Sequence, residues 1–565
     1  MNEHPKPIGY VVGGGLKASL QVRLTVPAQQ VQEGSFVIIQ TGNWQFYGLV
    51  TDLLLGATDP RFADEQSEAR LPANLAHLLH GQTLYTNLEV LLALMLERGP
   101  DPGSSEYPQW LAEHPELPRP LPVKTVPPHH APVSLAGEGD IAEIFGKADS
   151  QGNFVIGYTR EQNHPVCINL DHFVQRSSGV FGATGTGKSF LTRLVLAGLI
   201  HYNRASVLVL DMHNEYGLDD TASDTGRRVI GLKTKFPSRV RVVGLGQGAL
   251  IRGQTPDFNL EIAVGDIQPE DIELLTRELN LKETTPTVLE ALVSAFGRER
   301  WFSAFREMEN GAVMETEDGK KTPAPSSVAD WAARAGVNVM AAEGLHSKLS
   351  RLFHKAYIAE RPAADSVSEI IKSLEAGQHV VLSFGNFESD LDYLLVSNLL
   401  TRRIRQAWEE RTNTFRSKGE KEPRPLVIVL EEAHKLLNRE MAAQTTFSTI
   451  ARELRKYYVT LLIVDQRPSQ IYDEVMSQLG TRISGWLGDE DDIRAVLSGL
   501  AGREALRGML AHLQPQAEVL LLGWGVPMPL PVHSRRYDEA FWDDLLGKAS
   551  RKVDVAQNLK ELGFD

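Results

Sequence analysis

One stretch constrains this chain more than any other: residues 182–189, which read GATGTGKS. They fit the pattern G-x-x-x-x-G-K-[ST] at every defined position, and this pattern is typical of loops that bind nucleotide phosphates. Such a loop lies between a buried strand and a helix, and the sequence predicts both, at 178–181 and 190–200. Glycines let successive backbone N–H groups converge on phosphate oxygens, and the helix points its positive dipole end at them.

Two side chains of this loop receive chemical roles. Lys188 is expected to reach the β- and γ-phosphates, and the hydroxyl of Ser189 is expected to ligate Mg²⁺. ATP and Mg²⁺ are therefore the predicted cofactors. The alternative is a glycine-rich turn that precedes a helix by chance. The residues predicted to bind the nucleotide are Gly182, Ala183, Thr184, Gly185, Thr186, Gly187, Lys188, Ser189 and Phe190.

Length and composition limit the class of protein. A chain of 565 residues exceeds what one hydrophobic core usually holds, so roughly two to four domains are expected. The single cysteine, Cys167, excludes an intrachain disulfide and a cysteine-based zinc site, and it fits a reducing compartment. No apolar leader and no apolar run of about 18 residues occurs, so we expect a cytoplasmic location and no membrane span.

The charge balance bears on nucleic-acid binding. The chain has 58 basic and 72 acidic residues, for a formal net charge of −14. This argues against a broad basic face for DNA. A ring-shaped motor, however, can confine its basic residues to a channel, so the charge does not exclude nucleic acid.

The first 150 residues are predicted to form a small antiparallel β-barrel domain, because closing short strands into a barrel removes exposed edges. Residues 71–96 read as partly helical, and 133–145 as a return to barrel structure. Between them, 98–132 is dense in proline and is predicted to be a surface excursion without helix or sheet interior. The strands are expected at 20–26, 36–40 and 46–50.

Residues 151–266 and 377–540 are predicted to form an α/β domain with a parallel central sheet. Largely apolar runs are typical of parallel strands that are covered on both faces. A helical insertion is expected at 267–376, with a polar loop at 310–327, and a C-terminal helical tail at 541–565. A second polar loop is expected at 409–424. The predicted strands are 205–210, 240–243, 379–384, 426–430 and 460–464.

Acidic residues at the end of a predicted strand are candidates for the hydrolytic step. Glu431 and Glu432 follow the apolar run 426–430, and the carboxyl ends of parallel strands are where such enzymes hold Mg²⁺ and orient water. We assign Glu432 as the base that activates water and Glu431 as the metal-side acid, acting through water. The first acid is more often Asp, so Glu431 departs from the common pattern. The alternative is that both glutamates only begin a helix.

Other polar residues follow neighbouring predicted strands. Asp211, His213 and Glu215 follow one of them, and we expect them to serve as hydrogen-bonding partners around the site, with direct metal ligation as the alternative. Gln466 follows another strand, and its amide is suited to sense a γ-phosphate or orient water, because it both donates and accepts. The alternative for Gln466 is a simple polar turn.

Two arginines are candidates to stabilise the charge of the transferred phosphate. An inserted arginine does so in many such enzymes, often from a neighbouring subunit. Arg176, just before the strand at 178–181, and Arg455 are our choices. A surface salt bridge is the alternative for each.

Four motifs together resemble those of the HerA family, within the HerA/FtsK ATPase superfamily. The N-terminal β-rich region resembles the barrel domain of that family, and residues 518–532 resemble its C-terminal strands, so the resemblance spans nearly the whole chain. The four motifs are specific, whereas the barrel and the insertion match loosely. They are GATGTGKS at 182–189, DMHNEY at 211–216, LEEAH at 430–434 and DQRPS at 465–469.

This resemblance implies a RecA-like P-loop ATPase core with an N-terminal HAS-type barrel. It implies a homohexameric ring that uses ATP to move double-stranded DNA through its centre, independently of DNA sequence. It also implies a partner, the NurA nuclease, which would dock on the barrel and with which the family resects DNA ends in recombinational repair. By the same analogy, Arg176 and Arg455 would act on the nucleotide of a neighbouring subunit.

DNA contacts in such a ring are expected on loops that face the channel. A basic cluster follows the strand at 205–210, and we predict that it contacts DNA phosphates, with a solvated turn as the alternative. Its members are Arg227, Arg228, Lys233 and Lys235.

Two other functions stay open on the sequence alone. One is an ATPase ring of an antiphage module, paired with a different nuclease or an NAD-degrading effector. The other is a nucleotide-dependent scaffold or switch that does not move DNA. Glu432 and Gln466 argue against the scaffold, because a pure switch needs no hydrolytic residues.

Overall fold

The structure is a computed structural model. It divides into two compact units, of which the first comprises Met1–Phe173, Val180–Leu191 and Gly480–Tyr537, and the second Val174–Gly179, Thr192–Leu479 and Asp538–Asp565. The domain boundaries expected from the sequence stay a prediction. The residues that the structure describes are 6–16, 18–58, 84–100, 103–114, 118–148, 150, 152–221, 226, 228–315, 321–441, 447, 450 and 454–547.

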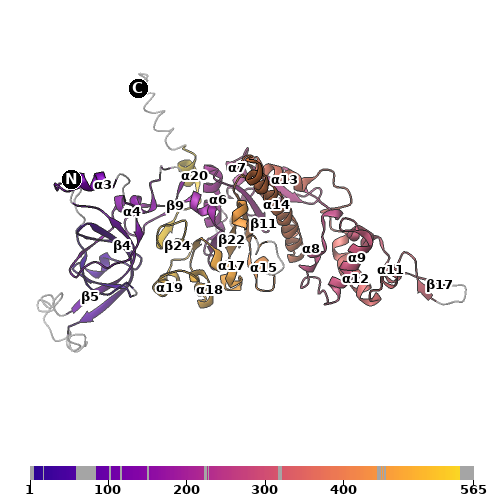
Figure 1. Cartoon of the computed structure of the whole chain (residues 1–565), viewed down its shortest axis with the longest axis horizontal. Helices are drawn as coiled ribbons and strands as arrows, with labels where there is room; N and C mark the ends of the chain where they lie inside the picture. Colours follow the sequence, from indigo (N-terminus) through magenta and orange to yellow (C-terminus); the bar gives the residue numbers. More distant parts are fainter. Residues whose placement is uncertain are drawn as a thin grey trace, which may run out of the picture. The chain divides into compact units, whose positions relative to one another are not determined.

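The N-terminal part of the first unit is a closed β-barrel (Figure 1). Its strands follow one another in the order β2-β1-β7-β3-β4-β5, and pairing of β2 with β5 closes the circle. Alternate side chains point inward, so that Val22, Val37 and Val90 are fully buried. The predicted barrel is confirmed. The strands are β1 (Gly9–Gly13), β2 (Leu20–Leu24), β3 (Phe36–Thr41), β4 (Trp44–Ala57), β5 (Leu84–Glu97) and β7 (Pro132–Leu135).

Three expectations for this region were wrong. Residues 71–96 were expected to be partly helical, but residues 84–97 form strand β5 (Leu84–Glu97), which pairs with β4 along its length. This pairing overrides the helix propensity of its leucines. Residues 71–83 lie outside the described residues. The proline-rich excursion contains a helix, α3 (Tyr107–Glu113), whose proline lies in the first turn, where a missing N–H costs nothing. Residues 138–145 form helix α4 (Glu138–Phe145), because Asp140 accepts the Gly137 N–H at its start.

The rest of the first unit adds antiparallel strands. The pairs β23–β24, β24–β25, β25–β8 and β8–β9 are all antiparallel, so the central sheet expected to be parallel is mixed. Helices α18 (Glu490–Leu497) and α19 (Arg503–Ala511) connect β23 to β24. The antiparallel strands are β8 (Asn153–Tyr158), β9 (Pro165–Asn169), β23 (Thr481–Ser484), β24 (Glu518–Gly523) and β25 (Leu530–Ser534). Strand β10 (Ser178–Phe181) is divided between the two units, and its last two residues belong to the first.

The second unit contains the predicted parallel sheet, in the order β15-β14-β20-β11-β21-β22. Neighbouring strands pair in parallel throughout. All five predicted apolar runs are strands, and β11 and β22 are buried at every residue. The strands are β11 (Ser206–Asp211), β14 (Val240–Leu245), β15 (Phe258–Leu260), β20 (His379–Ser383), β21 (Leu426–Glu431) and β22 (Val459–Asp465).

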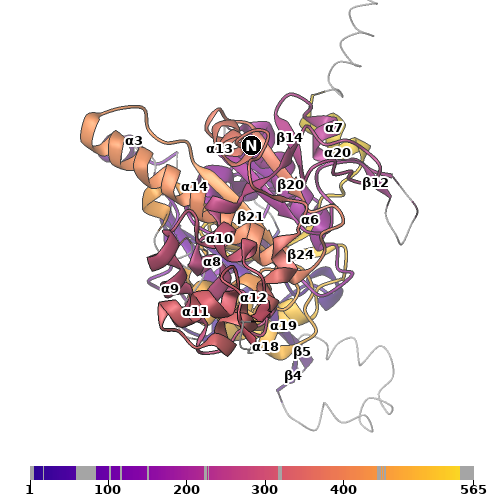
Figure 2. The ribbon, with the colours of Figure 1, turned by 90° about the vertical axis from the view of Figure 1, so that its right-hand side faces the viewer.

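Helices accompany this sheet. The longest is α14 (Asp390–Lys418), the long orange helix of Figure 2, which continues through most of the predicted loop at 409–424. That loop prediction was wrong because Trp408 and Thr412 are buried on the helix, which ends only at Gly419 in a left-handed conformation. The other helices are α6 (Lys188–Tyr202), α7 (Leu232–Lys235), α13 (Ser366–Glu375), α15 (His434–Leu437), α17 (Asp473–Gln478) and α20 (Glu539–Leu545).

The predicted helical insertion is present in the second unit (Figure 1). Its core is aromatic: Trp301, Phe302 and Phe305 are fully buried. The polar loop expected at 310–327 contains instead a short hairpin of β17 (Val313–Glu315) and β18 (Lys321–Pro323). The helices are η3 (Val264–Asp266), α8 (Pro269–Glu273), α9 (Thr285–Phe296), α10 (Trp301–Glu307), α11 (Val328–Ala335) and α12 (Val339–Phe353).

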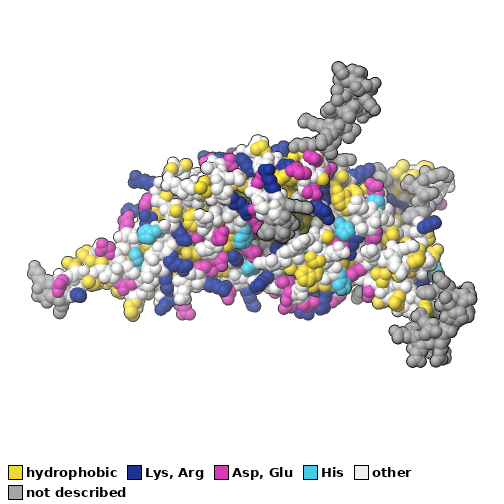
Figure 3. Space-filling view, turned by 180° about the vertical axis from the view of Figure 1, so that it is seen from behind, with side chains coloured by type: hydrophobic (Ala, Val, Ile, Leu, Met, Phe, Trp, Pro, Cys, Tyr) yellow, Lys and Arg dark blue, Asp and Glu magenta, His cyan; other side chains and the backbone are white. Residues whose placement is uncertain are grey.

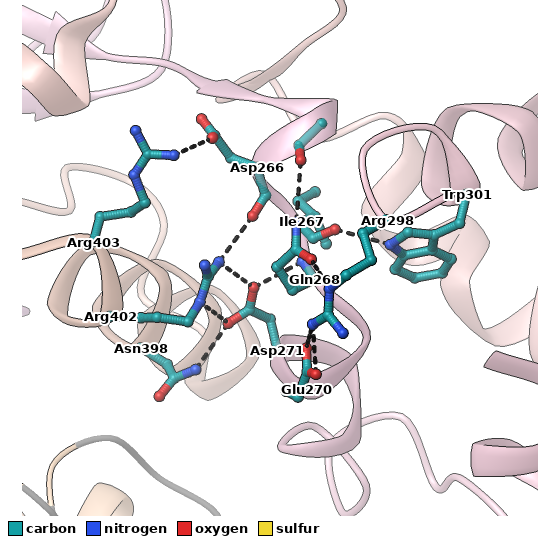
Figure 4. Close-up of polar contacts among 11 residues, drawn as sticks. Asp266, Ile267, Gln268, Glu270, Asp271, Arg298, Trp301, Asn398, Arg402 and Arg403 are labelled. Atoms are coloured by element: carbon teal, nitrogen blue, oxygen red, sulfur yellow. Dashed lines mark hydrogen bonds and ion pairs between the residues drawn. The ribbon is translucent and has the colours of Figure 1, made fainter. Parts of the chain in front are cut away.

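A polar network joins the base of the insertion to α14 (Figure 4). Asp271 is fully buried, and its carboxylate accepts hydrogen bonds from Arg402 Nη2 at 2.8 Å and from Asn398 Nδ2 at 2.9 Å. Arg402 Nη2 also reaches the Asp266 carbonyl at 2.8 Å, and Arg403 binds the Asp266 carboxylate at 2.8 Å. The insertion is therefore fixed to α14 by charged groups, of which Asp271 is fully buried.

We expect the Asp271→Ala variant to be destabilised by about 3 kcal/mol, because it leaves Arg402 without its buried partner. Thermal unfolding followed by circular dichroism should show a melting temperature lower by roughly 5–10 °C. Arg298→Ala is the matched control, because it breaks an ion pair with Glu270 in which both side chains are 55% exposed. Equal melting temperatures for the two variants would contradict this account.

Candidate nucleotide site

The phosphate loop follows β10 in the first unit, and its backbone has the conformation that the glycines allow. Gly182 has φ +157, and a Cβ atom there would lie 2.6 Å from the Thr186 hydroxyl oxygen, so no larger residue fits. Gly185 has φ +78 and open space where a side chain would be. Lys188 Nζ donates to the Ala183 carbonyl at 3.2 Å, which folds the lysine back over the loop. This cradle fits a phosphate group.

Other parts of the first unit support the loop. The Ala183 N–H donates to the Trp486 carbonyl at 2.9 Å, just after β23. Gln516, which has φ +66 before β24, donates from Nε2 to the Gly185 carbonyl at 2.8 Å. The sequence analysis missed Trp486 and Gln516, because neither lies in a motif and only the fold brings them to the loop.

A buried acidic pair lies at the ends of β11 and β21 in the second unit. Residues 210 and 430 are paired in register, so Asp211 and Glu431 follow neighbouring positions. Asp211 accepts the N–H groups of Glu215 at 2.8 Å and Tyr216 at 3.0 Å, which fixes the turn after β11. His213, in the same turn, is exposed.

The surroundings of Glu431 make this carboxyl group costly to ionise. Burial raises the pKa of Glu431 well above its ordinary value, and the charges of Asp211 and Glu215 add to this, while the Tyr216 hydroxyl and the His213 backbone offset part of it. Burial also raises the pKa of Asp211. The Oε2 atom of Glu431 is buried and has no hydrogen-bond partner of good geometry. A hard oxygen ligand of this kind fits Mg²⁺, directly or through water.

Glu432 and Gln466 lie together at the ends of β21 and β22. Gln466 Nε2 lies 3.2 Å from Oε2 and 3.4 Å from Oε1 of Glu432. Glu432 has φ +45, which is uncommon for a residue with a side chain. The structure thus brings these two predicted residues into contact. The alternative was that both glutamates begin a helix, but α15 begins only at His434.

Two further side chains complete this group. His434 Nδ1 lies 3.0 Å from Oδ2 of the fully buried Asp465 side chain and 3.5 Å from Oε2 of Glu432. Burial by itself lowers the pKa of His434, but the hydrogen bond to Asp465 and the charges of Asp465 and Glu432 outweigh it and raise the pKa above its ordinary value. Neither residue had a predicted role, because only the register of β21 against β22 brings Asp465 beside the turn that carries His434.

The sequence of this chain is similar to those of known proteins. A family profile described as "Helicase HerA, central domain" matches residues 154–404, which include the phosphate loop, β11, the insertion and the start of α14. The chain is also similar over nearly its whole length to proteins named "DNA double-strand break repair helicase HerA". Residues 154–404 of this chain therefore correspond to the central domain of the HerA helicases.

The relatives are distant in sequence. The HerA of Saccharolobus solfataricus is 24% identical over 531 residues, covering 93% of this chain and 91% of the relative. The HerA of Sulfolobus acidocaldarius is 22% identical over 537 residues, covering 94% of this chain and 93% of the relative. Among solved structures, the bacterial conjugative coupling protein TrwB aligns with a TM-score of 0.44 at 13% identity, covering 71% of this chain and 92% of TrwB.

The similarity to HerA agrees with the architecture of this chain. The predicted RecA-like P-loop ATPase core with an N-terminal barrel and a helical insertion is confirmed. Within the described parts of the chain, no helix is both long and apolar enough to cross a bilayer. No group of three or more His, Cys, Asp or Glu residues among those described is arranged to hold a metal ion.

The arginine candidates lie outside the two acidic groups. Arg455 is exposed in the short helix η4 (Leu454–Tyr457), and Arg176 is half-buried just before β10. The structure describes one chain, so their predicted role in a neighbouring subunit stays a prediction.

The described members of the predicted DNA cluster are each paired with an acid. Arg228 binds Asp219, Lys233 binds Asp257 at 2.9 Å, and Lys235 binds Glu539 at 3.0 Å. Arg227 lies outside the described residues. The Arg228 side chain remains 73% exposed, whereas that of Lys235 is only 13% exposed. Among these three, Arg228 is the best placed to meet a phosphate.

Surface charge shows the same intermixing. On the face shown in Figure 3, the described lysines and arginines are interspersed with acidic side chains and form no single basic patch. This face therefore offers no broad basic surface for DNA, and the predicted DNA contacts stay with individual loops.

Proposed function

We propose that this protein is a HerA-family ATP hydrolase that moves along double-stranded DNA. The observation that carries the proposal is the contact between Glu432 and Gln466 at the carboxyl edge of the parallel sheet, in a chain whose phosphate loop has an open cradle. A nucleotide-binding scaffold needs the loop alone. Here the Gln466 amide also contacts the Glu432 carboxylate, and the backbone of Glu432 is in the left-handed region. This arrangement supports hydrolysis in addition to binding.

Each of these residues has its own role in the proposed reaction. Lys188 would bind the β- and γ-phosphates. Ser189 would hold Mg²⁺ directly and Glu431 through water, and the ion would neutralise phosphate charge. Glu432 accepts a proton from the attacking water, whose oxygen bonds to the γ-phosphorus as the bond to ADP breaks. Gln466 orients that water. We propose that Lys188 and Glu432 act on one ATP molecule in this way.

The remaining predicted residues have supporting roles. Asp211 holds the turn that carries His213 and Glu215, and through it the surroundings of Glu431. Arg176 and Arg455 stabilise the phosphate charge from a neighbouring subunit, as in other ring-shaped ATPases.

For the assembly, we propose a homohexameric ring that acts in the cytoplasm with a NurA-like nuclease in DNA end resection and recombinational repair. The names of the relatives, as DNA double-strand break repair helicases, support the repair role. The barrel supports docking of the nuclease, since it exposes Leu54 and Leu55 on β4, at 42% and 88%.

ATPase activity should rise several-fold when linear double-stranded DNA is added to the full chain with Mg²⁺. In a motor that moves along DNA, each step uses ATP, so bound DNA increases the rate of hydrolysis. The measurement is phosphate release with and without DNA, at low salt so that electrostatic binding is retained. Closed circular DNA of the same length is the control for end dependence. Nucleotide binding without turnover, with or without DNA, would favour the scaffold or switch instead.

A further inference from the structure

The backbone at Glu432 needs an explanation that the hydrolytic role alone does not supply. A glutamate with φ +45 occupies the left-handed region, where its Cβ crowds the backbone. Such a conformation persists only when neighbouring groups hold it. The surrounding contacts therefore reveal what sets the position of the Glu432 carboxylate.

Asp465 fastens the turn after β21 to the end of β22. Its Oδ2 accepts the backbone N–H of His434 at 2.7 Å, and its Oδ1 accepts the backbone N–H of Arg467 at 2.7 Å. The register pairs residue 431 with residue 464, so Asp465 lies beside the turn that it fixes. The Asp465 side chain is 0% exposed, so these bonds form away from water.

The same carboxylate also orients the His434 ring. Nδ1 lies 3.0 Å from Asp465 Oδ2 and 3.5 Å from Glu432 Oε2. Because both of its close neighbours are carboxylates, Nδ1 carries the proton in this arrangement. Gln466 approaches the Glu432 carboxylate too, at 3.2 Å from Oε2. The Gln466 amide thus donates to the Glu432 carboxylate, and the His434 ring, which Asp465 anchors, lies against the same carboxylate.

We propose that His434, anchored by Asp465, is a positioning residue that fixes the Glu432 carboxylate for water activation. This inference rests on the proposed hydrolase function, since it assigns a role only if Glu432 is the base. Without the imidazole, the Glu432 carboxylate loses the neighbouring ring, whose Nδ1 lies 3.5 Å from its Oε2 atom, and is held less firmly. The fraction of ATP-bound protein with a correctly placed base then falls, while the phosphate loop is unchanged.

The test compares His434→Ala, His434→Asn and the wild-type full chain in steady-state ATP hydrolysis and in equilibrium binding of a fluorescent ATP analogue. We expect His434→Ala to lower kcat by roughly 10- to 100-fold, with KM and analogue affinity within about twofold of wild type. His434→Asn should recover most of kcat, because its amide N–H can reach the place of Nδ1. His354→Ala, an exposed histidine at the end of α12, should match wild type.

The outcomes separate this inference from the function on which it rests. If wild type hydrolyses ATP and His434→Ala retains its kcat, the positioning role is wrong and the hydrolase stands. If kcat, KM and melting temperature of both His434 variants change together, the histidine is only structural and the inference also fails. If wild type binds the analogue but never hydrolyses ATP, the hydrolase proposal itself fails. A lower kcat for Asp465→Asn, with analogue binding retained, would support the anchoring step independently.

Discussion

The Lys188→Ala variant is expected to bind ATP weakly and to lose at least about 100-fold in turnover. Lys188 is the one cationic side chain of the phosphate loop, and it lies over the cradle with Nζ 3.2 Å from the Ala183 carbonyl. Alanine removes the charge that would meet the β- and γ-phosphates, whereas the backbone cradle remains. Binding and catalysis should therefore fall together.

This expectation is measured by equilibrium titration with a fluorescent ATP analogue and by phosphate release. Lys421→Ala is the matched control, because Lys421 is exposed in the loop after α14 and has no role in the site. Wild-type affinity in Lys188→Ala would mean that residues 182–189 do not bind the nucleotide phosphates, and the assignment of this loop would be wrong.

The Glu432→Ala variant is expected to retain ATP but to hydrolyse it more slowly by roughly 10²- to 10⁴-fold, which is the usual contribution of a general base. Glu432 does not belong to the phosphate loop, so the affinity for ATP should stay close to that of wild type. Glu432→Gln tests the same point with the shape of the side chain preserved. Its amide cannot accept a proton from water, so turnover should be equally low.

The measurement for Glu432 is single-turnover hydrolysis together with analogue binding. A matched control is Glu440→Ala, because Glu440 is an exposed glutamate beyond α15. If Glu432→Ala loses ATP affinity as Lys188→Ala does, Glu432 contributes to binding rather than to chemistry. If Glu432→Gln turns over at the wild-type rate, another group is the base.

Much of the site was predictable because its residues follow recognisable strands. The apolar runs that became β11, β21 and β22 are continuous and short, which is typical of buried parallel strands, so the polar residues after them were expected at one edge of the sheet. The contact between Glu432 and Gln466 follows from that expectation. The role of Asp465 could not be predicted in this way. In the sequence, a buried carboxylate that accepts two backbone N–H groups cannot be told from an ordinary acid in a turn.

The errors in the fold have a common cause. Residues 84–97 are rich in leucine and were interpreted as partly helical, yet they pair with β4 across the barrel. Residues 409–418 are polar and were interpreted as a loop, yet they extend α14. In both segments, local composition favours one structure, and contacts with distant residues decide for another.

By itself the sequence determined the nucleotide-binding loop, the α/β class of the core and the identity of the acids at its strand ends, because each depends on residues that are close together in the chain. Only the tertiary structure decided which polar groups meet. The register of β21 against β22 brings Asp465 and Gln466 to Glu432, and the fold of the first unit brings Gln516 to the phosphate loop. Strand register depends on packing over the whole sheet, so no local pattern contains it.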